Sequence, residues 1–302
     1  MTLSLTRPPS GDPPAGAARE AAVPGVSPQV YSCKDFAAIA AMVHSETGIV
    51  LGERKRMLAY SRIVPLMRAG GQKSFAEFLD VARGDDALKR QVLDALTTNH
   101  TYFNREPHHF EHFAETLRGG LIERAQSGAT IRLWSAGCSS GEEIWTLLLT
   151  LLGPDRSTGR AIGKLNIVAL ASDISDGALE SAKAATYPGD ALRDLDGRLI
   201  ANWCEKQADG RIAIGPEARR MVRFRRLNLL GEWPFSSRFD IIFCRNVMIY
   251  FDQETKERLV ERLAGQLASG GHLYIGHSER VSGNGSALLE QAGPTIYRRR
   301  AP

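Results

Sequence analysis

The sequence predicts an α/β domain built on a mostly parallel sheet, preceded by an all-α domain and a flexible tail. After about residue 130, short apolar runs alternate with helix-length segments, which is typical of βαβ units with helices on both faces of a sheet. Before about residue 118, the apolar residues instead recur at the spacing of a helix. A glycine-bearing turn also follows the first short apolar run, at the place where doubly wound folds bind their ligands.

The composition is that of an ordinary globular protein. The chain has 302 residues, of which 43% are hydrophobic, enough for two modest domains or one large one. No apolar run reaches the roughly 20 residues that cross a bilayer, and no secretion signal opens the chain, so we expect a cytoplasmic protein. Its 38 basic and 34 acidic residues are too balanced to indicate nucleic-acid binding. Four cysteines without disulfide or metal-site spacing predict reduced thiols and no metal.

Three parts follow one another along the chain. Residues 1–29 are rich in Pro, Gly and Ala with few large apolar residues, so we expect a flexible tail. Residues 30–118 are expected to form the helical domain, because sets such as Phe36, Ile39 and Val43 share one helix face. Residues 119–302 then carry the α/β pattern.

The strand-like runs of the α/β part lie at 131–134, 167–171, 239–243 and 273–275. Between the second and third runs, residues 211–214 and 221–224 alternate apolar with polar side chains around Gly215 and Pro216. This alternation predicts a small antiparallel insertion, or the neck of one, and we place a β-subdomain at about 196–226.

The glycine turn at 134–143 favours a cationic ligand over a diphosphate. Gly137 and Gly141 let the backbone approach a ligand closely, but the usual dinucleotide fingerprint is absent. Glu142 and Glu143 at the start of the following helix would repel a pyrophosphate. S-adenosylmethionine, with its positive sulfonium and no phosphate, satisfies this requirement, while simple capping of the helix by the two glutamates is the alternative.

Three further strand ends carry polar side chains. Asp173 ends the second strand, where a carboxylate accepts hydrogen bonds from ribose hydroxyls, or else Asp173 or Ser175 caps the next helix. Asn228 follows another run, where its amide fits an adenine edge or a turn. Arg245 and Asn246 end the run that starts at Phe239, either as pocket residues or as the polar exit of a core strand.

Six segments in order resemble the chemotaxis receptor methyltransferases, the CheR family. They are TTNHTYFNRE (97–106), WSAGCSSGEE (134–143), ASDIS (171–175), LNLL (227–230), FDIIFCRNVMIYF (239–251) and GGHLYIGHSER (270–280). The resemblance covers roughly residue 31 to the C-terminus and departs at Ile144 and Trp145, where the family usually has Pro-Tyr. It implies a Rossmann-like class I S-adenosylmethionine-dependent methyltransferase domain with a small antiparallel β-subdomain, behind an all-α N-terminal domain.

The resemblance also implies the reaction. Family members methylate glutamate side-chain carboxylates on the cytoplasmic helices of chemoreceptors, with S-adenosylmethionine as donor and S-adenosylhomocysteine as product. A glutamate carboxylate is ionised at neutral pH, so its attack on the sulfonium methyl needs positioning and no general base.

Residues carried over from the family motifs form two sets. The expected cofactor residues are Asn99, Thr101, Arg105, Glu143, Asp173, Asn228, Leu229, Arg245 and Asn246. Arg105 and Tyr250 are the expected transfer-site residues. Thr101 and Arg105 lie one turn apart if their segment is helical, so both would then face the pocket. The alternative role of Arg105 and Tyr250 is packing between the domains and cofactor binding only.

Receptor docking is expected on a basic cluster of Arg54, Lys55, Arg56, Arg62, Arg68 and Lys73, although a solvated helix face is the alternative. Pro65 predicts a kink or a helix end within it. Some family members bind a receptor C-terminal pentapeptide through a β-subdomain loop longer than residues 205–210 here, so we expect that this enzyme does not depend on the tether. We also expect a monomer.

Two rival classes are less well supported. A nucleic-acid base methyltransferase usually carries an Asn/Asp-Pro-Pro-aromatic motif where this chain has 245–248. A cofactor-binding regulator without activity would be expected to have lost pocket residues, and the expected ones are present.

Overall fold

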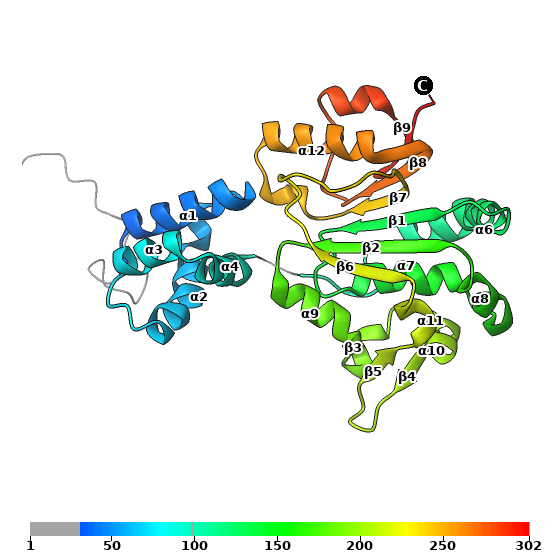
Figure 1. The fold of residues 1–302 in the computed structure, drawn as a ribbon, viewed down its shortest axis with the longest axis horizontal. Helices are drawn as coiled ribbons and strands as arrows, with labels where there is room; N and C mark the ends of the chain where they lie inside the picture. The colour runs from blue at the N-terminus through cyan, green and yellow to red at the C-terminus, as the bar shows by residue number, and fades with distance from the viewer. Residues whose placement is uncertain (1–30, 98–99, 302) are drawn as a thin grey trace, which may run out of the picture.

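The structure is a computed structural model that describes residues 31–97 and 100–301. The predicted tail, residues 1–29, lies outside this part of the chain. The described residues form a helical domain, seen at the left of Figure 1, and an α/β domain. The predicted α/β fold with an all-α N-terminal domain is thereby confirmed.

The helical domain consists of α1 (Cys33–Thr47), α2 (Arg56–Ala69), α3 (Phe75–Gly84) and α4 (Asp86–Leu96), with a short 3₁₀ turn, η1 (Glu53–Lys55), before α2. Ser32 caps α1 with a capping box, and aromatic rings of Tyr31 and Phe75 pack in the core. A helix end at Pro65 was one expectation and is wrong, because α2 continues through Pro65 to Ala69. Packing of Ile63, Val64 and Met67 into the core holds this part helical despite the missing N–H.

The main sheet has the strand order β6-β2-β1-β7-β8-β10-β9. Its parallel strands are β6 (Val222–Arg226), β2 (Ile167–Asp173), β1 (Ile131–Ala136), β7 (Phe239–Cys244) and β8 (Leu267–Ile275). The strands β10 (Ile296–Arg299) and β9 (Leu289–Gly293) pair antiparallel at one edge. The strand order reverses between β1 and β7, and ligands bind at the carboxyl edge of such a reversal.

Helices cover both faces of this sheet (Figure 1). Ile241 and Phe243 of β7 belong to the core that contains α7 (Glu142–Leu152), whereas Ile242 and Cys244 belong to the core that contains α12 (Gln253–Gln266). Because successive strand residues point to opposite faces, a strand buried on both sides carries a nearly continuous apolar run, here residues 241–244. The other helices of the domain are α5 (His108–His112), a π-helical turn η2 (Phe113–Leu117), α6 (Arg118–Gln126), α8 (Arg156–Ile162), α9 (Asp176–Ala184), α10 (Gly197–Trp203) and α11 (Pro216–Arg219).

A small antiparallel sheet projects from the α/β domain, as predicted. It contains β3 (Thr186–Tyr187), β5 (Ile212–Ile214) and β4 (Cys204–Lys206) in the order β3-β5-β4. The prediction that the run 221–224 pairs within this insertion is wrong. Residues Val222–Arg226 pair parallel to β2 at the edge of the main sheet instead. The short helix α11 lies between β5 and β6 in the chain and makes the turn that separates these two strands.

The boundary expected after residue 118 stays a prediction, as does the extent of the β-subdomain at 196–226. Phe103, Phe110 and Phe113 are buried in the core of the α/β domain. We therefore propose that this domain includes Phe103 and so begins ahead of α5.

Candidate active site

An interdomain cavity lies at the carboxyl edge of the main sheet, with a volume of about 270 Å³. The helical domain contributes Thr47, Ile49, Lys55 and Leu96 to its wall. The sequence-predicted residues that line it are Thr101, Arg105, Glu143, Asp173, Asn228, Leu229, Arg245, Asn246 and Tyr250. Asn99 lies outside the described residues. The structure thus brings into one cavity side chains that are far apart in the sequence.

The glycine turn after β1 is shaped by left-handed backbone. Gly137 has φ 80° and Gly141 has φ 99°, and Ser139 between them has φ 50°. A Cβ on Gly137 would lie 2.5 Å from a methyl of Val247, so the turn and the loop after β7 touch here without room for a side chain. This close packing lets both loops border the cavity.

Asp173 is a buried carboxylate at the tip of β2. It accepts the backbone N–H of Ser139 at 2.8 Å and that of Ser175 at 3.0 Å. Burial raises its pKa despite these hydrogen bonds. The N-terminal cap of α9 is Ser175, whose hydroxyl accepts the N–H of Ala178. Because Ser175 makes the cap, Asp173 keeps acceptor capacity for a ligand in the cavity.

Arg245 sits between two carboxylates at the centre of the site. Its guanidinium lies 3.2 Å from Glu143 and 3.3 Å from Glu106, and its side chain is 2% exposed. Glu143 also accepts the hydroxyl hydrogen of Ser135 at 2.7 Å. Burial raises the pKa of Glu143 against the attraction of Arg245. Glu142, whose oxygen accepts from the Ser140 hydroxyl, is not among the lining residues, so the geometry favours Glu143 as the ligand-facing glutamate.

Glu106 is a residue to which sequence reasoning gave no role. Its carboxylate contacts Arg245, the ring of His277 at 3.0 Å and the amide of Asn246 at 3.4 Å. Burial alone would raise the pKa of Glu106, but Arg245 and the hydrogen bonds from His277 lower it to about 2. Glu106 therefore stays ionised. It links the interdomain segment, described from residue 100 to residue 106, to the loops after β7 and β8.

Residues 100–106 are not helical, so the condition under which Thr101 and Arg105 would share a helix face is not met. Asn104 and Glu106 have φ near 57°, which bends the backbone sharply on either side of Arg105. The Arg105 guanidinium donates to the carbonyl of His100 at 2.7 Å. Thr101 and Arg105 nevertheless both line the cavity. Phe103, fully buried against Tyr187, anchors the segment between them.

Asn228 joins the two domains. Its side-chain amide donates to the carbonyl of Glu46 at 2.7 Å, and its side-chain oxygen accepts the N–H of Leu230 at 2.9 Å. The second bond is the turn geometry that was the alternative to adenine binding. One amide hydrogen and one lone pair of the side chain are thus engaged within the protein. The following residue, Leu229, is buried at the cavity wall.

The loop after β7 is held by Glu279, a second residue to which the sequence analysis assigned no role. Its buried carboxylate accepts the backbone N–H groups of Asn246 (3.1 Å), Met248 (2.8 Å) and Gly276 (2.6 Å). Asn246 adopts a left-handed conformation with φ 57°. Burial raises the pKa of Glu279 although these donors favour its charge. Glu279 thereby fixes the loop that presents Arg245, Asn246 and Tyr250.

Tyr250 and Lys55 meet across the domain interface. The Lys55 ammonium lies 4.9 Å from the centre of the Tyr250 ring, in cation–π geometry. The backbone carbonyl of Tyr250 accepts the N–H of Val50 at 2.8 Å. Burial raises the pKa of the Tyr250 phenol and lowers that of the Lys55 ammonium. The cavity wall therefore carries a cation from the helical domain beside the expected transfer-site tyrosine.

Comparison with protein families gives the identity of both domains. Residues 34–97 match the CheR methyltransferase all-alpha domain, and residues 99–296 match the CheR methyltransferase SAM binding domain. The chain belongs to the CheR methyltransferase family. It is 39% identical over 262 residues to a probable chemotaxis protein methyltransferase of Rhizobium etli, covering 85% of this chain and 96% of that protein. A chemotaxis protein methyltransferase of Borreliella burgdorferi is 38% identical, with 85% and 91% covered. Chemotaxis protein methyltransferase 2 of Pseudomonas aeruginosa is 35% identical, with 88% and 93% covered.

This CheR methyltransferase uses S-adenosylmethionine, and the cavity fits that cofactor. The buried Asp173 offers acceptors for ribose hydroxyls, and Glu143 offers negative charge beside the glycine turn. The turn allows close approach, and the nearby Arg245 is paired with Glu143 and Glu106. In the described ranges, 31–97 and 100–301, no helix combines the length and apolarity of a membrane span.

Proposed function

We propose that this CheR methyltransferase methylates glutamate side-chain carboxylates on the cytoplasmic helices of chemoreceptors. The products are glutamate methyl ester and S-adenosylhomocysteine. The enzyme acts as a monomer in the cytoplasm, without binding nucleic acid or inserting into the membrane. The observation that carries the proposal is the interdomain cavity, which combines buried carboxylates on the sheet side with cations near the domain interface.

Bound S-adenosylmethionine supplies an electrophilic methyl on its sulfonium. The residues we assign to its binding are Asn99, Thr101, Arg105, Glu143, Asp173, Asn228, Leu229, Arg245 and Asn246. Asp173 holds ribose hydroxyls, and Glu143 lies on the cationic side of the ligand. Arg245 holds Glu143 in place, and its own charge is offset by Glu106. The hydrogen bonds to Glu46 and Leu230 use one amide hydrogen and one lone pair of Asn228. The remaining amide hydrogen and lone pair are available to the cofactor.

The acceptor carboxylate meets Arg105, Lys55 and Tyr250. Among the described residues, Arg105 and Lys55 form no ion pair, in contrast to Arg245 on the same wall. An incoming glutamate therefore provides their first carboxylate partner and keeps its negative charge in a partly buried site. The Tyr250 phenol, kept protonated by its raised pKa, donates a hydrogen bond to the same carboxylate. Holding an ionised oxygen near the methyl supplies much of the rate, since no proton has to move.

The basic cluster has fewer docking residues than its sequence suggests. Arg56 is buried, and Arg62 donates to the carbonyls of Ala95 (2.8 Å) and Thr97 (2.9 Å), so both stabilise the helical domain. Arg54, Arg68 and Lys73 are exposed, and Lys55 faces the cavity. We propose that Arg54 and Lys55, next to the cavity, contact the acidic receptor helix first, while Arg68 and Lys73 add long-range attraction.

Independence from a receptor pentapeptide is supported by the hairpin between β4 and β5. Its turn is tight, with hydrogen bonds from the N–H of Gln207 to the Arg211 carbonyl at 2.8 Å and from the N–H of Gly210 to the Gln207 carbonyl at 3.1 Å. The loop is therefore short and offers little backbone to bind a peptide. Calorimetry with a receptor C-terminal pentapeptide should detect no specific binding, and a saturable heat would contradict the proposal.

The function is tested by transfer of labelled methyl from S-adenosylmethionine to membranes that contain chemoreceptors. We expect label on the receptors that base releases as methanol, because base hydrolyses a carboxyl methyl ester. Membranes from a receptor-deleted strain are the matched control. Labelled product that is stable to base, or label in nucleic acid, would refute glutamate esterification. Absence of any product with all native receptors would favour a regulator that binds the cofactor without catalysis.

A further inference from the structure

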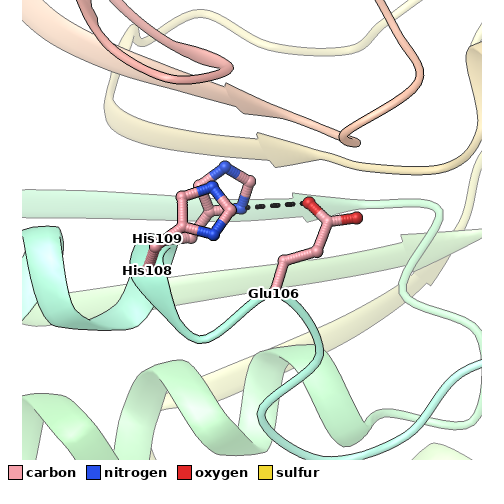
Figure 2. A group of neighbouring side chains, drawn as sticks. All are labelled: Glu106, His108 and His109. Atoms are coloured by element: carbon pink, nitrogen blue, oxygen red, sulfur yellow. Dashed lines mark ion pairs between the residues drawn. The ribbon is translucent and has the colours of Figure 1, made fainter.

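A cluster of possible metal ligands lies beside the proposed active site. Glu106, His108 and His109 join the interdomain segment to α5, and their ligand atoms all lie within 4.8 Å of one another (Figure 2). None of the three is among the residues that line the interdomain cavity. His109 is fully buried, and the two histidine rings stand 4.1 Å apart between centres.

We assign the proton of neutral His109 to Nε2. With this assignment the hydroxyl of Thr295 donates to the carbonyl of Pro294 at 2.6 Å, and its oxygen accepts from His109 Nε2, 2.8 Å away. Because a neutral imidazole carries one N–H, Nδ1 of His109 presents a bare lone pair.

That lone pair faces an anion. Nδ1 of His109 lies 3.6 Å from Oε2 of Glu106, and within the described chain neither buried atom has a hydrogen-bond partner. Two buried acceptors that face each other repel. Arg245 pairs with Oε2 of Glu106, but Nδ1 of His109 has no hydrogen-bond partner among the described residues, and a metal ion between the two atoms would remove the repulsion.

We propose that Glu106, His108 and His109 bind a divalent transition-metal ion such as Zn²⁺, and that its binding inhibits methyl transfer. Zinc binds imidazole nitrogen and carboxylate oxygen at about 2.0–2.2 Å, which sets two tetrahedral ligands about 3.4 Å apart. The observed 3.6 Å between His109 and Glu106 matches this spacing. The half-buried His108 moves inward to supply the third ligand.

Inhibition follows from Arg245, and this part of the proposal rests on the proposed function. The guanidinium of Arg245 lies 3.3 Å from the same Glu106 oxygen that the metal would take. A dication there repels the guanidinium and weakens its hold on Glu106. Arg245 also pairs with Glu143 at the cavity wall, so metal binding and the ordered cofactor site oppose each other.

The test uses untagged, full-length enzyme stripped of metal with a chelator. Zn²⁺ alone is titrated against a chromogenic chelator for the wild type, for His108→Gln, and for His44→Gln, which alters an exposed histidine of α1. We expect one Zn²⁺ per wild-type chain, an affinity at least about tenfold weaker for His108→Gln, and no change for His44→Gln. Equal zinc affinity of the wild type and His108→Gln, or no binding by the wild type, would overturn the site.

Methyl transfer is then measured with and without zinc, each variant relative to its own zinc-free rate. Zinc should inhibit the wild type and His44→Gln at concentrations that leave His108→Gln active. Binding without inhibition would overturn the inhibitory role. If no methyl transfer is found at all, the proposed function fails, while the zinc titration still decides the site.

Discussion

Replacement of Arg245 by Met tests the charge network at the centre of the site. The change keeps much of the side-chain volume but removes the guanidinium between Glu143 and Glu106, whose side chains are 12% and 11% exposed. Leaving buried charges without their partner costs about 3–5 kcal/mol of unfolding free energy. For a domain of this size that corresponds to a fall in Tm of about 6–20 °C.

The effect should depend on pH with a defined sign. The pKa of Glu106 is about 2 in the folded protein and 4.5 ordinarily, so its pairing stabilises the fold above pH 4.5. This contribution, about 3 kcal/mol, is lost as the pH falls from 4.5 towards 2. Without Arg245, Glu106 is easier to protonate. The stability difference between the wild type and Arg245→Met should therefore be largest at neutral pH and shrink below about 4.5.

Urea unfolding followed by circular dichroism at pH 7 and at pH 4 measures both effects. Arg83→Met is the matched control, because Arg83 pairs with Asp80 on an exposed helix face and should lose no more than about 1 kcal/mol. A loss below about 1 kcal/mol for Arg245→Met, or a loss that does not change with pH, would show that this network does not have the assigned role.

Four residues of the cavity are tested by single substitutions. Asp173→Asn sets an amide against the N–H groups of Ser139 and Ser175, so calorimetry should show S-adenosylhomocysteine binding weakened about 10- to 100-fold. Gly137→Ala strains a backbone at φ 80° and presses on Val247, so thermal unfolding should show a loss of about 1–3 kcal/mol. Arg105→Ala should reduce methyl transfer at saturating cofactor about 100-fold or more, and near-normal turnover would remove Arg105 from the transfer site. Lys55→Gln should raise KM for receptor membranes at least about threefold without changing S-adenosylhomocysteine affinity, while Lys55→Arg retains most activity.

The sequence predicts the sheet and its strand-end residues well because both leave local patterns. Residues 241–244 are all apolar because this part of β7 is buried on both faces of the sheet. Asp173 and Arg245 follow such runs, so their place at the carboxyl edge can be inferred before the fold is known. The spacing of apolar residues likewise predicts the helices of the N-terminal domain.

Contacts between distant segments leave no such pattern. Glu106 and Glu279 are acidic residues in polar segments, and only the fold shows one beside Arg245 and the other beneath the loop after β7. Asn228 bonds to Glu46 of the other domain, which no spacing along the chain reveals. The bends beside Arg105 come from left-handed residues that are not glycine. For that reason Thr101 and Arg105 reach the cavity without a helix between them.

Mass spectrometry of receptor peptides after reaction tests the central claim most directly. Purified enzyme, S-adenosylmethionine and receptor membranes are incubated, and each peptide is compared before and after mild base. The proposal predicts one methyl group on glutamate side chains, removed by base, and absent with Arg105→Ala. Methyl groups on lysine or another residue, or glutamates that stay unmodified while methyl donor is consumed, would contradict it.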